Sequence, residues 1–271
     1  MRRFEKIVER LRSEQRGEAI EEFGRIGGLL RGRHLKIPDR LLYAIVDSFI
    51  DLFRQSGRDD LVARAAEEAA GVLGDDPDWG FARGESLFNL GRFEEARNTL
   101  EPLAQGDIEE PMVLYYLACL AEREGEHRRA KTLFEKAHRL DPESCTLPVP
   151  VTEEEALRVY RECLSELPEE IARSLGDIPI YVDGLPSDEL IHMDDPPLDP
   201  LVLGVFLGVP AGEERGSWPD AQPRIVLFHR NIAKAGGDRE ILRKELRTTL
   251  FHEVGHAIGL EEEQLAAMGL G

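Results

Sequence analysis

The apolar positions in the last part of the chain follow a spacing that is typical of a helix. Between Asp238 and Ile258 they recur every four residues and form one buried stripe. This stripe consists of Leu242, Leu246, Leu250, Val254 and Ile258. Asp238 follows two glycines and is expected to cap the start of the helix, and Gly259 is expected to end it.

Three shorter apolar runs upstream predict a small mixed sheet. In Ile178–Val182 apolar residues alternate, and Pro179 favours an edge strand because proline has no N–H to donate. Leu201–Val209 is apolar almost throughout and is expected to be a buried central strand. Arg224–His229 is the third run. The loops 184–200 and 210–223 are long, acidic and rich in proline, as lids and binding loops often are.

Two prolines in Ser144–Val151 break the helical pattern, so this segment is interpreted as a short linker. Thr152 and Glu155 then have the spacing of a capping box, which predicts the start of a helix that ends near Pro168. A shorter helix is expected from Pro168 to Gly176.

The first half of the chain carries a repeat. Gly57, Gly91 and Gly125 are each 34 residues apart, and a glycine turn between two helices at that period is the tetratricopeptide signature. Other repeat positions agree, with small residues at Gly84, Ala118, Ala96 and Ala130 and large apolar residues at Leu100 and Phe134. The chain therefore resembles the tetratricopeptide-repeat family over about residues 43–143. Residues 2–32 also read as a helix pair that turns near Gly17.

The resemblance to tetratricopeptide repeats implies a concave groove for a peptide or a protein partner. The alternative is that these helices only pack against the C-terminal domain as a scaffold. Trp79, Tyr115 and Tyr116 are interpreted as packing residues rather than ligand contacts.

Together these patterns predict an α + (α+β) fold class with two domains. Residues 1–143 are expected to form a helical-hairpin repeat solenoid, and residues 144–151 a linker. Residues 152–271 are expected to form a small α+β domain with a short mixed sheet and one long helix near its end.

Composition narrows the possible partners. The net charge of −19 argues against binding to nucleic acid or to anionic membranes, because both would be repelled. Cys119, Cys145 and Cys163 have no C-x-x-C spacing and are interpreted as reduced thiols. Charges throughout Met1–Leu11 do not fit a signal peptide, and no apolar run is long enough to span a membrane, so a cytoplasmic location is expected.

The long C-terminal helix contains the motif H-E-x-x-H at residues 252–256. His252 and His256 are one turn apart, so both imidazoles face the same side and could bind one metal ion. Glu253 is offset by one residue, where a general base would sit beside the metal. The motif predicts a zinc site.

A catalytic zinc site uses three protein ligands and an open position. The acidic residues after His256 are Glu261, Glu262 and Glu263. The third ligand is expected among them unless an upstream element or the chain terminus supplies it. The pattern H-E-x-x-H-x-x-G-x-x-[H/D] favours Glu262, which lies ten residues after His252, with Gly259 at the position of the turn.

This pattern resembles the metzincin arrangement, although no convincing Met-turn follows; Met268 is interpreted as a packing residue. Residues 152–268 as a whole resemble the small bacterial zincin-like metallopeptidases, also called minimal metalloproteases. The resemblance rests on the Leu-Pro that ends the first helix, the Leu203–Pro210 and Arg224–Ile232 strands and the motif helix. In that family the third ligand is usually Asp, so Glu262 would be one methylene longer.

The other titratable residues are interpreted as structural. His229, on the third predicted strand, could be a ligand but is more typical of a partly buried structural histidine. Glu245 lies two turns before His252, about 10 Å along the helix, which is too far to bind the same ion.

Two functions follow from these predictions. In the first, the protein is a zinc-dependent peptidase in which zinc lowers the pKa of its bound water to about 7 and Glu253 is the general base. An edge strand, expected to be Arg224–Ile232, would hold an extended peptide substrate, and the repeats would bind a protein substrate or partner. In the second, the protein is a repeat-based adaptor with a structural or catalytically weak zinc site.

Overall fold

The computed structural model describes residues 39–106, 109–209, 222–235, 237–260 and 263–264. The chain divides into two compact units, with the boundary between Leu120 and Ala121. This boundary is defined by contacts between residues, and it lies inside a helix. The domain boundaries predicted from the sequence, 1–143, 144–151 and 152–271, stay predictions. The helix pair predicted at residues 2–32 and most of the loop 210–223 lie outside the described residues.

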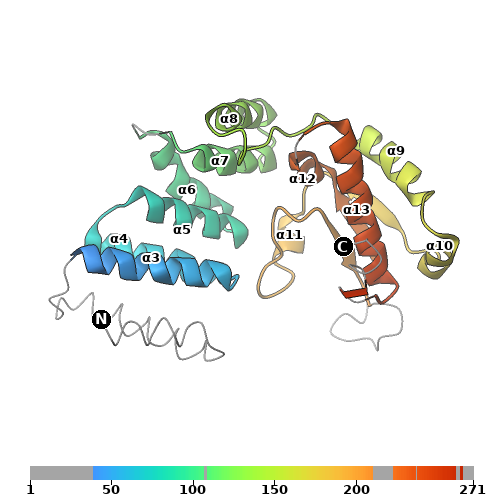
Figure 1. The fold of residues 1–271 in the computed structure, drawn as a ribbon, viewed down its shortest axis with the longest axis horizontal. Helices are drawn as coiled ribbons and strands as arrows, with labels where there is room; N and C mark the ends of the chain where they lie inside the picture. Colours follow the sequence, from blue (N-terminus) through green and yellow to red (C-terminus); the bar gives the residue numbers. More distant parts are fainter. Residues whose placement is uncertain (1–38, 107–108, 210–221, 236, 261–262, 265–271) are drawn as a thin grey trace. The chain divides into compact units, whose positions relative to one another are not determined.

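The first unit is built of consecutive antiparallel helix pairs (Figure 1). Its helices are α3 (Asp39–Gln55), α4 (Asp59–Leu73), α5 (Pro77–Asn89), α6 (Phe93–Ala104) and most of α7 (Pro111–Arg123), which crosses the boundary. The glycines that define the 34-residue period all have positive φ, at 64° for Gly57, 70° for Gly91 and 76° for Gly125. Each therefore makes a turn that other residues would strain, and the predicted helical repeat is confirmed.

The crossing of α5 and α6 shows why the repeat needs a small residue at Gly84. A Cβ placed there would lie 2.4 Å from Cδ2 of Leu100, which is itself fully buried. Trp79 and Tyr116 are also buried, as predicted for packing residues.

The second unit combines helices with a three-stranded sheet (Figure 1). Its elements after α7 are α8 (His127–Leu140), α9 (Glu153–Leu164), α10 (Glu169–Leu175), β1 (Ile180–Asp183), α11 (Asp188–Ile191), β2 (Gly204–Leu207), β3 (Arg224–Phe228), α12 (His229–Lys234) and α13 (Arg239–Ala257). The strand order is β1-β3-β2, with β1 parallel and β2 antiparallel to β3. The predicted fold class, a helical repeat region followed by a small α+β domain with a mixed sheet, is confirmed.

Two strand predictions were wrong. The run containing β2 was expected to be central, but in the described sheet it lies at an edge, and β3, expected to be an edge strand, lies in the middle. The third strand also ends at Phe228, because His229 already begins α12. Both runs are apolar, so hydrophobicity alone did not show which strand has neighbours on both sides.

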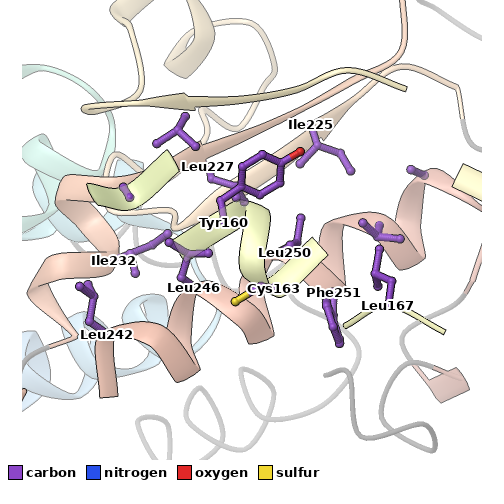
Figure 2. Close-up of a cluster of buried hydrophobic side chains, with 14 of the residues drawn as sticks. Tyr160, Cys163, Leu167, Ile225, Leu227, Ile232, Leu242, Leu246, Leu250 and Phe251 are labelled. Atoms are coloured by element: carbon purple, nitrogen blue, oxygen red, sulfur yellow. The ribbon is translucent and has the colours of Figure 1, made fainter. Parts of the chain in front are cut away.

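The core of this unit lies between the sheet and helices α9 and α13 (Figure 2). Figure 2 shows Leu246 and Leu250 of the predicted α13 stripe near Tyr160 and Cys163 of α9, and Leu242 near Ile232 of α12, all in one buried cluster with Ile225 and Leu227 of β3. Just after α9, Glu166 forms ion pairs with Arg243 and Arg247 of α13. These contacts fix the helix that carries the H-E-x-x-H motif.

The predicted starts of α9 and α13 are also confirmed, whereas α9 ends at Leu164, a few residues before the predicted end near Pro168. Thr152 and Glu155 form the capping box at the start of α9. The Asp238 carboxylate accepts hydrogen bonds from the backbone N–H groups of Glu240 and Ile241 at the start of α13. None of the helices in the described parts of the chain is long and apolar enough to cross a membrane.

Candidate metal centre

His252 and His256 face each other near the end of α13. Their Nε2 atoms are 3.0 Å apart, and their rings are nearly perpendicular, at 89°. Two lone pairs at that distance would repel, so the pair needs a proton or a cation between the nitrogens. A tetrahedral zinc with bonds of about 2.0–2.1 Å to each nitrogen would separate them by about 3.3–3.4 Å. Opening the pair by a few tenths of an ångström would therefore be enough for these two histidines to fill two positions of a tetrahedral zinc site.

Glu253 points toward the sheet. Its side chain is 8% exposed, although it carries a carboxylate. A Cβ added to Gly204 of β2 would lie 3.2 Å from Cγ of Glu253 and 2.8 Å from Cγ2 of Thr249. The missing side chain at Gly204 thus lets β2 approach α13 closely. The side chain of Glu253 lies between this helix and the edge strand β2.

The chain reverses immediately after the motif. Gly259 has φ +81°, its N–H donates to the carbonyl of His256, and the N–H of Leu260 donates to the carbonyl of Gly255. These two bonds are a Schellman motif, which only a residue that tolerates positive φ accommodates well. The predicted role of Gly259 as the end of the helix is confirmed.

Glu262, the predicted third ligand, lies outside the described residues, as does Glu261. Glu263 is described and exposed. Within the described part of the chain, no third His, Cys, Asp or Glu joins His252 and His256 in a metal-binding group. The assignment of Glu262 therefore stays a prediction.

Two parts of the chain match known family models. Residues 175–271 match the zincin-like metallopeptidase family model. Residues 111–144 match the tetratricopeptide-repeat model. The combination of a repeat and a zincin-like domain that the sequence predicted is therefore confirmed. No match was found among curated proteins.

His229 has a structural place in the zincin-like domain. Its Nδ1 lies 2.8 Å from the carbonyl oxygen of Asp183, at the end of β1. Burial lowers the pKa of His229, and the hydrogen bond to this carbonyl opposes the shift only in part. A neutral ring that donates Nδ1–H to Asp183 satisfies both observations. The interpretation of His229 as a partly buried structural histidine fits this arrangement.

Sequence reasoning missed several residues that position the site. Thr249 packs beside Gly204, and Asn231 and Lys234 of α12 are buried. Only Gly204 left a signal in the sequence, as a glycine that interrupts an apolar strand. Asn231 and Lys234 lie in a short helix, and their partners outside it, Pro200, Val202 and Glu122, are distant in the chain.

The repeat unit has a candidate partner groove of its own. A groove of about 620 Å³ runs along α3 and α5, and Phe81 and Met112 are among its apolar lining residues. Four carboxylates also line it, from Asp47, Asp51, Asp78 and Glu85, together with Arg54. Arg54 pairs with Glu85 at 2.8 Å, so the groove carries more negative than positive charge.

Proposed function

We propose that this protein is a zinc-dependent peptidase. The observation that carries the proposal is the facing Nε2 pair of His252 and His256, with buried Glu253 between them in sequence, inside a domain that matches zincin-like metallopeptidases. His252, His256 and, by spacing, Glu262 would hold the zinc. When bound, zinc supplies a Lewis acid that polarises the scissile carbonyl and lowers the pKa of water.

Glu253 is proposed as the general base. Its carboxylate would accept a proton from the attacking water and deliver it to the leaving amine as the C–N bond breaks. Its low exposure excludes most bulk water, which favours proton transfer to the substrate over loss to solvent.

We propose β2 rather than β3 as the strand that binds an extended substrate. The N–H of Phe228 donates to the carbonyl of Leu203, and antiparallel strands alternate between hydrogen-bonded and non-bonded pairs. Gly204 and Phe206 are paired with Leu227 and Ile225. Because the neighbouring pair Leu203–Phe228 is hydrogen-bonded, these two pairs are non-bonded, and the N–H and C=O groups of Gly204 and Phe206 face away from β3. On that side no strand lies among the described residues, so a peptide could add there as a further strand.

The test is Glu253→Ala in the full chain, measured by bound zinc and by peptide hydrolysis. We expect one zinc per chain in the variant and hydrolysis lowered by about a hundredfold or more, the usual contribution of a general base. Glu245→Ala, on the same helix about two turns earlier, is the matched control and should retain activity. Hydrolysis by Glu253→Ala equal to that of the wild-type chain would refute the proposed role.

A second function is favoured by the acidic groove of the repeat unit, which would suit a basic protein segment. In this alternative the protein is an adaptor, and its zinc site is structural or catalytically weak. Bound zinc without turnover on any peptide or protein tested, together with tight binding of a partner that Asp51→Lys abolishes, would favour it. If both functions hold, the repeats deliver a protein substrate to the zincin-like domain.

We also propose a cytoplasmic location. The three cysteines form no disulfide among the described residues, and all three are buried. This is the usual state in a reducing compartment.

A further inference from the structure

The loop that leads into β2 is held by one buried side chain. Asn231 of α12 is 2% exposed, and its Nδ2 donates to the carbonyl oxygens of Pro200 at 3.0 Å and Val202 at 2.7 Å. Two residues later the chain enters β2 at Gly204. The amide of Asn231 thus fixes the backbone immediately before the strand that packs on Glu253.

The orientation of that amide is set by Lys234. The Lys234 ammonium is a donor only, and it donates to Oδ1 of Asn231 at 3.1 Å and to the carbonyl of Arg230 at 3.3 Å. Because the oxygen of Asn231 must face the ammonium, its two N–H groups must face the carbonyls before β2. An amide turned the other way would oppose donor to donor on one side and acceptor to acceptor on the other.

Lys234 is in turn anchored to the last turn of α7. Its side chain is 5% exposed and lies 2.5 Å from the Glu122 carboxylate. The neighbouring Arg123 donates to the carbonyl of Pro186 at 3.0 Å and pairs with Asp188 at 2.7 Å. Two adjacent residues of opposite charge at the end of α7 therefore tie this turn to α12 and to the start of α11.

We propose that Asn231 is a positioning residue for β2, and that the Glu122–Lys234 ion pair keeps it in its working orientation. The last turn of α7, the end of the first helix of the repeat, would then control how closely Gly204 packs on Glu253. The link to catalysis rests on the proposed peptidase function, whereas the link to the position of β2 does not.

The test uses two variants of the full chain. Asn231→Asp removes the donors to Pro200 and Val202. The double variant Glu122→Met, Lys234→Met replaces a buried ion pair by apolar side chains of similar length, a change that usually preserves folding. It frees the oxygen of Asn231 without touching the loop. Arg173→Met, which breaks the exposed Glu169–Arg173 pair, is the control.

Amide hydrogen exchange of residues 201–207 is the primary readout, with bound zinc and thermal melting measured in parallel. In both variants we expect exchange in this segment to rise by about tenfold or more. Asn231→Asp removes the two buried hydrogen bonds to the loop, and the double variant removes the ammonium that keeps the Asn231 amide turned toward it. Zinc content should stay at the wild-type value. In the double variant the melting temperature should also change little. If the ion pair had a purely structural role, faster local exchange would instead be accompanied by a lower melting temperature.

With a peptide substrate, both variants should show a larger rise in KM than fall in kcat, since β2 is the proposed binding strand. Unchanged exchange of residues 201–207 in both variants would overturn the inference. If the wild-type chain itself hydrolyses no peptide, the proposed function fails, and the exchange measurement still decides whether Asn231 positions β2.

Discussion

The close approach of β2 to α13 depends on a single missing side chain. At Gly204 an added Cβ would meet Thr249 at 2.8 Å, Leu227 at 3.0 Å and Glu253 at 3.2 Å. All three neighbours belong to a packed core, so none can yield without moving its own surroundings. The position therefore links the packing of the edge strand directly to the proposed general base.

We predict that Gly204→Ala destabilises the chain by about 1–3 kcal/mol, the usual cost of overpacking a core. It should also lower hydrolysis more than zinc binding, because the shift falls on Glu253 rather than on the histidines. Urea unfolding and zinc content measure the two effects. Gly184→Ala, where the nearest contact is an ordinary 3.4 Å, should be close to neutral. Equal stability of the two alanine variants would contradict the argument.

His229 predicts a pH dependence of stability. Because burial lowers its pKa in the folded chain, the unfolded chain binds more protons as the pH falls below about 6.5. Its contribution to stability is complete above that pH, declines as the pH falls from there toward the lowered folded-state pKa, and levels off below it.

In His229→Asn the side-chain amide can still donate to the Asp183 carbonyl but does not titrate. We expect its unfolding free energy to fall less than that of the wild-type chain between pH 7 and pH 5, as measured by urea unfolding at each pH. His192→Asn, at an exposed position, serves as the control. Parallel pH profiles for the wild-type and His229→Asn chains would show that burial of this ring is not linked to folding.

At the scale of the element, α13 carries His252 and His256 near its C-terminal end and the Asp238 N-cap at its start. The Asp238 carboxylate lies 2.8 Å from the N–H of Glu240 and 3.0 Å from that of Ile241. Both N–H groups would otherwise lack a partner within the helix. The cap therefore stabilises the first turn of the helix on which the site is built.

We expect Asp238→Ala to lower the unfolding free energy by about 1 kcal/mol, whereas Asp238→Asn should retain most of it because Asn is an equally good N-cap. Thermal or urea unfolding of the two variants tests this. A loss in Asp238→Asn as large as that in Asp238→Ala would show that the negative charge, and not the hydrogen bonds, is what matters.

Local rules predicted the ends of elements well. The Thr152 capping box, the Asp238 cap and the Gly259 stop all involve residues within a few positions of one another, so the sequence contains the whole interaction. Strand order is different. Which of β2 and β3 lies in the centre depends on partners far along the chain, and both runs are rich in apolar residues.

The same reasoning applies to the site. The His252–His256 pair follows from helical spacing alone, and the structure places the two rings together. The Asn231 network could not be predicted, because it joins α12 to two distant segments: Asn231 contacts Pro200 and Val202 before β2, and its neighbour Lys234 contacts Glu122 of α7. No local pattern marks such a contact.

At the scale of the whole molecule, the packing boundary falls inside α7 and not after the last repeat. The second unit therefore includes the end of α7 and α8. The 34-residue period identified the repeats correctly. Such a period predicts the helix pairs of a segment, but it does not predict the compact unit to which each helix belongs.

We predict that a chain of residues 150–271 is less stable than one of residues 111–271, by roughly 2 kcal/mol or more, because it loses the partners of Lys234, Arg230 and Asp188. Urea unfolding followed by circular dichroism measures the difference. The 111–271 chain with the Arg173→Met change should behave like 111–271 itself. Equal stability of the long and short chains would show that the last turn of α7 and α8 contribute nothing to this unit.

The polar ties at the end of α7 join residues that are far apart in the chain. Arg123 and Asp188 are separated by 65 positions, and His127 and Arg230 by 103. Contacts of such long range form late in folding, because the entropy of closing the intervening loops must be overcome first. During synthesis the last turn of α7 emerges before its partners, so this helix can form before α11 and α12 dock onto it. The repeat would thus serve as a folding template for the domain that follows it.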